Sequence, residues 1–293
     1  MIAGIDHVVI LVNDLAQAST HYKALGFTVV PGGTHADGAT HNALIIFQDS
    51  SYLELLQFLR EAPEHRWWRH VVHGEGLIDW ALLPTTIADD VQAAQQAGLH
   101  LDGPLPGGRL RPDGKQVEWQ MAFPPSPDLP FLCGDVTPRT LRVPEGDHRT
   151  HPNGVLGIAG VVVAVNHIDT SVTHYRALLQ VADETRTGNT GATELPQPII
   201  PELGARIALL PAGNAAIMLA QPGGALLFRA LTDDEETTIS MPSTGPLTTA
   251  LAERGEGLYS LALRVSTGRD TGYDALLHNP TNTHGVRVEL IAE

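Results

Sequence analysis

The sequence predicts an α+β fold built from tandem βαβββ modules, which pair into cupped mixed β-sheets with flanking helices. Two observations predict it. The segment Gly4–Leu25 is repeated without a gap at Gly157–Leu178, an offset of 153 residues (157 − 4). The tetrapeptide Gly-Glu-Gly-Leu at 74–77 recurs at 255–258, where the second module of each half is expected to begin. Because internal repeats indicate a fold made of repeated units, we expect four modules in two halves.

The first module, at about residues 4–58, shows the order strand, helix and three strands. The β-branched run 5–12 predicts a strand, and the apolar spacing over 15–25, after a capping Asn-Asp pair, predicts a helix. Gly26 ends that helix. Further strands are expected at 27–30, 42–47 and 52–58, with a turn at 31–38.

The other three modules repeat this order with decreasing clarity. The second, at about 76–135, is expected to hold a strand at 77–83, a helix at 87–97, a Gly/Pro-rich stretch to 108, and strands at 116–123 and 129–133. The third, at about 157–222, carries an added loop at 183–202. The fourth, at about 255–293, is short, with a final strand at 285–291 and little helix.

A chain of 293 residues fits two domains better than one. Residues 135–156 carry three prolines and no apolar periodicity, so they are expected to connect the halves. The predicted domains are therefore 1–150 and 151–293. Two pairings are open: first module with second and third with fourth, or first with fourth and second with third. The latter would bring Glu289 toward His7 and Glu54.

The composition excludes several classes of partner. The net charge is −15, from 33 acidic and 18 basic residues without a Lys/Arg-rich run, so nucleic acid and anionic membranes are not expected partners. The sequence has no long apolar span and no export signal. A single cysteine, Cys133, forms no intrachain disulfide and suits a cytoplasmic location. The expected partner is a small molecule, bound by a monomer or a homodimer.

His7 and Glu54 are the leading candidates for chemistry. His7 lies in the first predicted strand, and Glu54 lies in the last strand of the same module between apolar neighbours. A carboxylate in so apolar a strand must face solvent, a partner or a cavity. Distant strands can bring such residues together for metal binding or acid–base work, although the pair could equally be hydrogen-bonded and structural.

The opening IDHVVILVNDL and the strand YLELLQF resemble the two metal-ligand positions of a vicinal oxygen chelate module, as in glyoxalase, fosfomycin-resistance proteins and extradiol dioxygenases. The motifs GEGL at 74–77, LPFL at 129–132 and HPNG at 151–154 are similar to the glyoxalase-like subgroup. The resemblance implies that paired modules wrap a cavity. It also implies a divalent metal there, with zinc, manganese, iron, nickel and magnesium all open, that binds two oxygens of the substrate.

The ligand set implied by this resemblance is incomplete. Aligning the second module on the first puts Asp79 opposite His7, and Cys133-Gly134 near the position of Glu54. In the third module Gly160 and Met218 stand at the two ligand positions, and the fourth keeps Glu289 but has Ser260 in place of histidine. Catalytic sites usually present three protein ligands. Asp79 or Glu289 would therefore have to complete the set.

Three other residues are candidates for substrate binding. Arg109 lies near a Pro-Asp-Gly turn. Its charge could simply be solvated at the turn, or its guanidinium could contact an anionic oxygen of the substrate. Trp119 is expected in the core or stacked on a ligand. His151 is included only because of the HPNG resemblance. His21 and His174 occupy equivalent helix positions, which favours a packing role.

Two functions follow from these residues. The first is a metal-dependent isomerase, lyase or dioxygenase in which Glu54 moves a proton. The alternative is a binding protein that sequesters a small molecule without metal or catalysis. In either case the second half is a candidate scaffold that has lost its ligands.

Overall fold

The computed structural model describes residues 1–181, 199–200, 204–229, 236–241, 244–266 and 282–293. The first half holds eight strands and two longer helices, in chain order β1 (Ile2–Leu11), α1 (Leu15–Ala24), β2 (Val30–His35), β3 (Thr40–Ile46), β4 (Tyr52–Phe58), β5 (Gly76–Pro84), α2 (Ile87–Gln96), β6 (Asp102–Leu110), β7 (Gln116–Phe123) and β8 (Phe131–Asp135). A 3-10 helix (Trp68–His73) lies between β4 and β5. The predicted α+β class is confirmed.

The strands of the first two modules form one closed barrel, in the order β1-β4-β3-β2-β6-β7-β8-β5. The modules meet at two seams. At one seam β1 runs antiparallel to β5, and at the other β2 pairs with β6 through Thr34 with Leu110 and His35 with Arg109. First and second modules therefore pair, and the alternative pairing of first with fourth does not occur.

The second half repeats the plan as an open sheet. Its elements are β9 (Val155–Ala164), α4 (Ile168–Leu179), β10 (Ile199–Ile200), β11 (Ala205–Ala212), β12 (Ala215–Pro222), β13 (Gly224–Arg229), β14 (Glu236–Met241), α5 (Pro246–Arg254), β15 (Gly257–Val265) and β16 (Val288–Ala292). Six strands have the order β10-β11-β12-β9-β15-β16, and β13 forms a separate two-stranded sheet with β14 in the described part of the chain. The third module therefore pairs with the fourth through β9 and β15.

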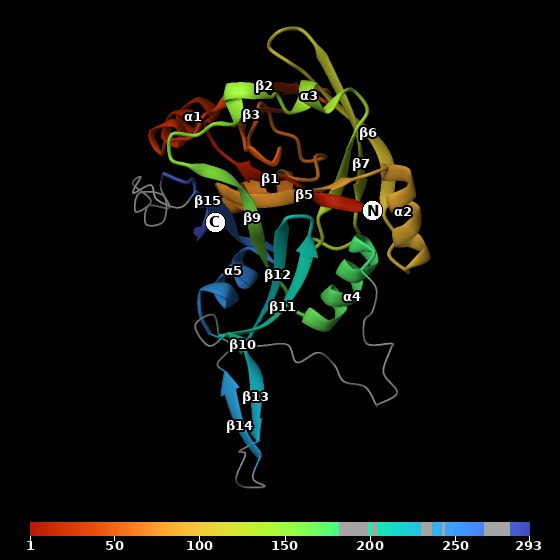
Figure 1. Cartoon of the computed structure of the whole chain (residues 1–293), viewed down its shortest axis with the longest axis vertical. Coiled ribbons are helices and arrows are strands. Elements are labelled where there is room, and N and C mark those ends of the chain that lie inside the picture. The colour runs from red at the N-terminus through yellow and green to blue at the C-terminus, as the bar shows by residue number, and fades with distance from the viewer. Residues whose placement is uncertain (182–198, 201–203, 230–235, 242–243, 267–281) are drawn as a thin grey trace.

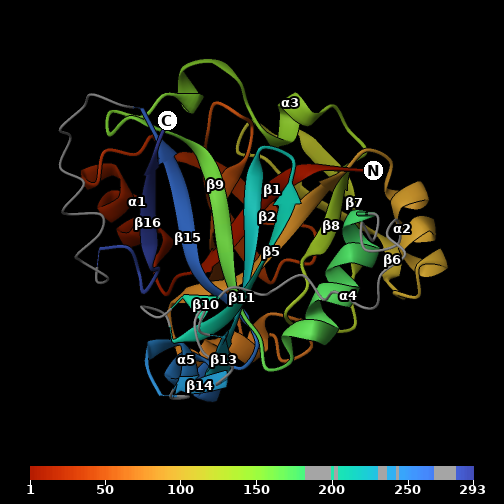
Figure 2. The same cartoon turned by 60° about the horizontal axis from the view of Figure 1, so that its bottom comes forward.

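The two halves pack with the outer face of the barrel against the second sheet (Figures 1 and 2). One apolar core contains the outward-facing residues of β1, such as Val8 and Ile10, together with Val161 and Val163 of β9. A second core inside the barrel contains Val9, on the opposite face of β1. Because both faces are covered, β1 is almost entirely buried, which explains its long apolar run.

The other face of the second sheet is covered by α5. Leu247 and Leu251 of this helix pack with Val162 and Met218 from the sheet. The ladder pairs Val162 with Met218 as it pairs Val9 with Glu54, so Met218 stands at the position of Glu54. An apolar helix face thus occupies the space that corresponds to the barrel interior.

The structure departs from the predicted elements at the barrel closure and in the connecting segment. The strand predicted at 27–30 lies instead at 30–35, and β6 forms within the Gly/Pro-rich stretch. A register shift between Asp102 and Leu105 accommodates the proline at 104, since a bulge does not require every backbone N–H. The connecting segment forms the short helix α3 (Arg139–Arg142) and a 3-10 turn at 146–149. The loop predicted at 183–202 lies almost wholly outside the described residues.

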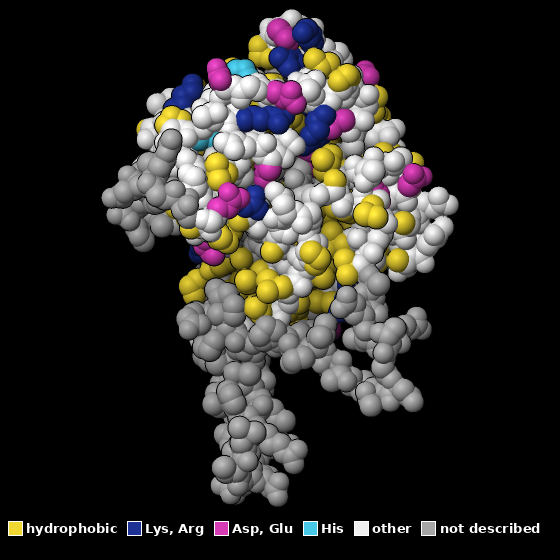
Figure 3. Space-filling view, viewed as in Figure 1, with side chains coloured by type: hydrophobic (Ala, Val, Ile, Leu, Met, Phe, Trp, Pro, Cys, Tyr) yellow, Lys and Arg dark blue, Asp and Glu magenta, His cyan; other side chains and the backbone are white. Residues whose placement is uncertain are grey.

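Charged side chains of both signs are interspersed over the barrel and α3 at the top of the face in Figure 3. Such mixing leaves no extended basic surface on this face for a polyanion. Among the described helices, none combines the length and apolar character that crossing a bilayer requires.

Candidate active site

A cavity opens inside the first barrel. The space that it encloses, including the open mouth, is about 800 Å³. The polar part of its wall includes His7, His35, Asn42, Glu54 and Arg109. The apolar part includes Trp119, Met121, Phe123 and Phe131. The cavity therefore combines a few converging polar groups with an aromatic wall.

A β-bulge in β1 helps to place His7. The pairing of β1 with β5 shifts between Ile5 and His7, which breaks the strict alternation of faces. The Nδ1 of His7 lies 2.7 Å from Oδ2 of Asp6, and its ring stacks on Tyr52 with 4.6 Å between centroids. An ionised carboxylate only accepts hydrogen bonds, so Nδ1 donates and Nε2 remains for another partner.

Glu54 lies between two imidazoles. The Nε2 of His7 is 3.4 Å from its Oε2, and the Nε2 of His35 is 3.4 Å from its Oε1. The side-chain amide of Asn42 donates to Oε1 at 2.7 Å. Burial raises the pKa of Glu54, but the two histidines, this hydrogen bond and Arg109 outweigh burial and hold the pKa below its usual value. Glu54 is therefore ionised at neutral pH.

His35 is held in a similar way to His7. Its Nδ1 lies 2.7 Å from the hydroxyl of Thr40, a fully buried residue. Burial lowers the pKa of His35 more than Glu54 raises it, so the ring is neutral at pH 7. Each histidine thus has Nδ1 held by an oxygen atom and Nε2 beside Glu54, which is the usual arrangement of metal-binding histidines.

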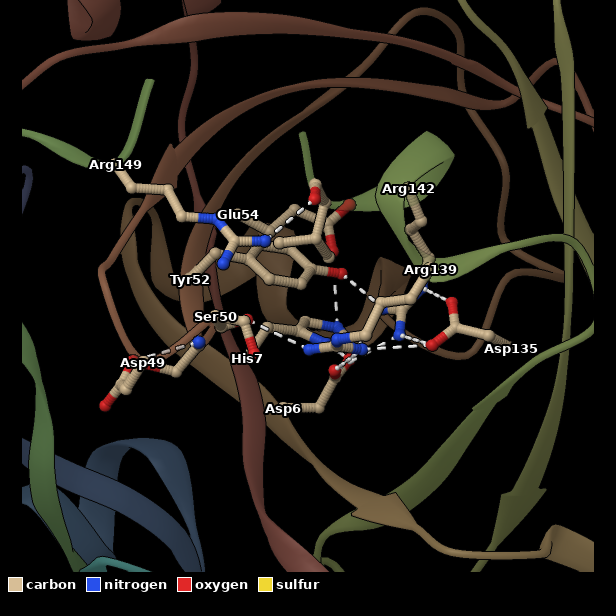
Figure 4. Close-up of polar contacts among 12 residues, drawn as sticks. Asp6, His7, Asp49, Ser50, Tyr52, Glu54, Asp135, Arg139, Arg142 and Arg149 are labelled. Atoms are coloured by element: carbon tan, nitrogen blue, oxygen red, sulfur yellow. Dashed lines mark hydrogen bonds and ion pairs between the residues drawn. The ribbon is translucent and has the colours of Figure 1, made fainter. Parts of the chain in front are cut away.

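A buried ion network lies beside His7 and includes Asp6, its Nδ1 partner (Figure 4). Arg142, from α3, donates to both oxygens of Asp6 at 2.6 and 3.1 Å, to the Tyr52 hydroxyl at 2.9 Å, and to Asp135 at 2.5 and 3.0 Å. Arg139 lies 2.7 Å from Asp6. Burial alone would raise the pKa of Asp6, but the two arginines hold it well below its usual value. The connecting segment, through these two arginines, therefore holds Asp6 in place, and Asp6 in turn orients His7.

Residues 5–179, more than half of the chain, match the family model described as a glyoxalase-like domain. The chain belongs to this glyoxalase-like family. Among curated proteins, none matches the sequence significantly. The predicted resemblance to glyoxalase-like proteins is confirmed.

Two solved structures share the fold of this glyoxalase-like chain. A hypothetical protein from Staphylococcus aureus aligns with a TM-score of 0.61 at 11% identity, over 99% of both chains. A mutant of 4-hydroxymandelate synthase from Streptomyces coelicolor aligns with a TM-score of 0.55 at 16% identity, over 91% of this chain and 72% of the other. At such identities the likeness concerns the fold alone.

Two groups in the glyoxalase-like barrel could hold a metal ion. Ligand atoms of Asp6, His7 and Cys133 lie within 4.8 Å of one another. However, both oxygens of Asp6 already accept from Arg142, and burial raises the pKa of the Cys133 thiol, which disfavours the thiolate that binds metals. The group formed by His7, Glu54 and His35 has no competing arginine within ion-pair distance among the described residues. It is the better candidate.

Two pairwise distances in this second group equal the separation of two ligands of a divalent ion. Two ligand atoms about 2.1 Å from a tetrahedral ion lie roughly 3.4 Å apart. That is the separation of Glu54 from each of the two histidine Nε2 atoms. The donors therefore have the chemical type that a metal requires. Each histidine faces a different oxygen of Glu54, however, and one ligand atom from each of the three residues does not come within 4.8 Å of the other two.

Asp79 and Glu289, the residues proposed to complete the ligand set, lie elsewhere. Asp79 accepts from the indole of Trp67 at 2.7 Å and lies 3.3 Å from Arg66, and it is not part of the cavity wall. Burial raises its pKa despite Arg66. Glu289 is exposed in β16 of the second sheet, where Ser260 donates to it at 3.2 Å. Neither residue is brought to His7.

The position that matches Glu54 in the second module is held by Phe131, not by Cys133-Gly134 as the sequence alignment suggested. The ladder pairs Ala81 with Phe131 as it pairs Val9 with Glu54. The ring of Phe131 stands edge-on to His7, with 5.5 Å between centroids. The second module therefore contributes an apolar wall where the first contributes a carboxylate.

Of the three residues predicted to bind substrate, two line the cavity. Arg109 and Trp119 are part of its wall, whereas His151 is not. His151 accepts from the backbone of Thr28 at 3.0 Å and lies 3.0 Å from the carbonyl of Ile46. Burial lowers its pKa to about 4. His151 thus attaches the connecting segment to the first module.

Sequence reasoning missed His35, Asn42, Asp6 and Arg142. His35 falls in a segment predicted to be a turn, so its place in the wall depends on strand β2. Asp6 had a usable signal, because a second ionisable residue beside His7 in an apolar strand also needs a buried partner. Arg142 had none, since the return of the connecting segment to the barrel is a tertiary contact.

Gly32 leaves room for Asn42, the residue whose side-chain amide donates to Glu54. A Cβ at this position would lie 1.9 Å from Oδ1 of Asn42 and 3.1 Å from Nη1 of Arg109. We expect Gly32→Ala to displace Asn42 and to lower the free energy of unfolding by about 1–3 kcal/mol, measured by urea denaturation. Adding Asn42→Ala should restore part of the loss. An undiminished loss in the double variant would show that the overlap is not with Asn42.

Proposed function

We propose that the first barrel is the active site of an enzyme that acts on a small organic molecule with the help of a divalent metal ion. His7, Glu54 and His35 would hold the ion. One observation carries the proposal: two imidazoles with fixed Nδ1 atoms direct Nε2 toward different oxygens of one ionised, buried carboxylate. Two nitrogen donors and one oxygen donor suit Zn²⁺, Mn²⁺ or Fe²⁺.

A bound ion would supply polarisation of a substrate oxygen. The side chains of the barrel supply the rest. Glu54, ionised at neutral pH, would accept a proton from the substrate, and Asn42 orients its carboxylate. The aromatic wall, formed in part by Trp119 and Phe131, excludes water from the apolar part of the ligand.

The second half supports the fold in this proposal. Gly160 and Met218 stand at the positions of His7 and Glu54, and α5 packs over the corresponding face of the sheet. Its sheet also covers the outer face of β1, the strand that carries His7. The scaffold role accounts for the loss of ligands from the second half.

Metal binding tests the proposal directly. Protein expressed without a histidine tag should bind about one equivalent of Zn²⁺, Mn²⁺ or Fe²⁺. We expect His7→Ala, Glu54→Gln and His35→Ala each to weaken binding by more than about 100-fold, because the loss of a supporting residue alone costs 10–100-fold. His100→Ala, which removes an exposed imidazole, should have no effect. Equilibrium dialysis with metal analysis measures the stoichiometry of the wild type and the metal affinity of each variant.

Thr40→Val is a finer test of the role of His35. The substitution removes the hydroxyl that holds Nδ1 but keeps the shape of the side chain. We expect metal affinity to fall by about 10-fold or more while the fold is retained. Absence of stoichiometric metal after incubation with all three ions would contradict the proposal. A ligand that then raised Tm without metal would favour the alternative of a metal-free binding protein.

A further inference from the structure

Arg109 is a buried arginine that lacks an acidic partner among the described residues. Only 3% of the residue is exposed. One guanidinium nitrogen donates to the carbonyl of Arg142 at 2.8 Å, and Nε has no hydrogen-bond partner. No described carboxylate lies within 4.0 Å of the group. A buried cation without a counter-ion is unfavourable for folding, so this arginine is better explained by a ligand than by stability.

The other buried arginine of the site shows the contrast. Arg142 forms ion pairs with Asp6 and Asp135. A third cation of the cavity wall, Arg66, lies 3.3 Å from Asp79. Arg109 is thus the cation in the described part of the wall whose charge no aspartate or glutamate neutralises at contact distance. Glu54 influences it only from a distance.

Arg109 also lies beside the proposed metal donors. At the seam of the barrel it is the direct cross-strand partner of His35. Side chains in such pairs are close neighbours on the same face of a sheet. An anion bound to the guanidinium would therefore occupy the end of the cavity where His35 and Glu54 lie.

The remainder of the wall defines the rest of the ligand. Trp119, Met121, Phe123 and Phe131 form an apolar surface that is largely aromatic. Rings of this kind favour stacking or edge contact with a flat apolar group. A ligand that satisfies both parts of the wall has an acidic head and an apolar body.

We infer that Arg109 binds the acidic group of the ligand, and that the substrate class is a small organic carboxylate with an apolar, preferably aromatic, body. This inference rests on the proposed function for the location of catalysis, but not for binding. A carboxylate can accept two parallel hydrogen bonds from a guanidinium, which a neutral group of similar shape does not reproduce.

Benzoate and benzamide form a matched pair of probes, because they share the ring and differ in the charge of the head group. Titration calorimetry on the full chain in EDTA removes any contribution from metal. We expect benzoate to bind saturably and benzamide to bind at least about 10-fold more weakly. Arg109→Gln should weaken benzoate binding by about 10- to 100-fold, as is typical of a lost charged hydrogen bond. Arg60→Gln, at an exposed ion pair with Glu64, should have no effect.

A second variant separates binding from structural support. If Arg109 serves the ligand, Arg109→Met should keep or raise Tm of the ligand-free protein while it abolishes benzoate binding. A fall in Tm in this variant, with Arg109→Gln still binding benzoate normally, would assign the arginine to the fold and overturn the inference. So would absence of saturable benzoate binding to the wild type, or equal binding of benzamide.

Two separate measurements on the wild type, metal binding by equilibrium dialysis and benzoate binding in EDTA, keep the two proposals apart. If metal binds and benzoate does not, the enzyme proposal stands and the carboxylate inference fails. If benzoate binds through Arg109 and no metal binds, the inference stands without the metal.

Discussion

Arg142→Met is expected to lower the free energy of unfolding by about 3–5 kcal/mol at pH 7. Breaking a buried ion pair by removing one partner leaves an uncompensated charge, and losses of this size are typical. Asp6 is fully buried, and Arg142 contacts both of its oxygens. Urea denaturation of the metal-free protein measures the loss, with the m-value as the check that the fold is retained.

The matched control for this variant also removes the negative charge of Asp6, which Arg142→Met leaves without its main partner. Asp6→Asn combined with Arg142→Met should be more stable than Arg142→Met alone, because the amide is neutral when buried. Arg139→Met should cost less than Arg142→Met, since Arg139 is partly exposed. A loss below about 1 kcal/mol for Arg142→Met would mean that Arg139 alone neutralises Asp6.

The strand–helix order of the modules could be predicted because its main determinants are local. The repeat beginning at Gly4 and Gly157, and the change from alternating to helical apolar spacing, define the strand–helix start of a module. Strand β6 was missed for a physical reason. Its pairing with β7 depends on backbone hydrogen bonds and on a bulge around Pro104, so the apolar pattern that marks a strand is absent.

The site was predictable only where the first module determines it. The β1–β4 ladder places Glu54 beside Val9, two residues from His7 in the sequence, and this proximity follows from the module itself. The position of His35 follows from closure of the barrel between β2 and β6, where His35 pairs with Arg109, 74 residues later in the chain (109 − 35). No local pattern encodes that closure. For the same reason Asp79 looked like a ligand, although Trp67 and Arg66 hold it outside the cavity wall.

Acid should weaken the wild type through the same network that Arg142 supports. The pKa of Asp6 lies well below the usual 3.8 in the folded protein. The unfolded chain therefore binds this proton at a higher pH than the folded chain does. The contribution of Asp6 to stability is complete above about pH 4 and is lost as the pH falls from about 4 through the folded pKa. Glu54, whose pKa is also lowered, adds to the effect in the same direction.

Arg142→Met should change this pH dependence as well as the stability. Without Arg142, burial is opposed mainly by Arg139, so the pKa of Asp6 rises and its charge becomes a cost that protonation relieves. We therefore expect the difference in unfolding free energy between wild type and variant to be largest at pH 7 and to shrink as the pH falls through the raised pKa of Asp6 in the variant. Denaturation curves collected in EDTA from pH 7 to pH 3 measure it. A difference that stays constant over this range would show that the cost of Arg142→Met comes from lost packing, because only the ionic contribution depends on the proton carried by Asp6.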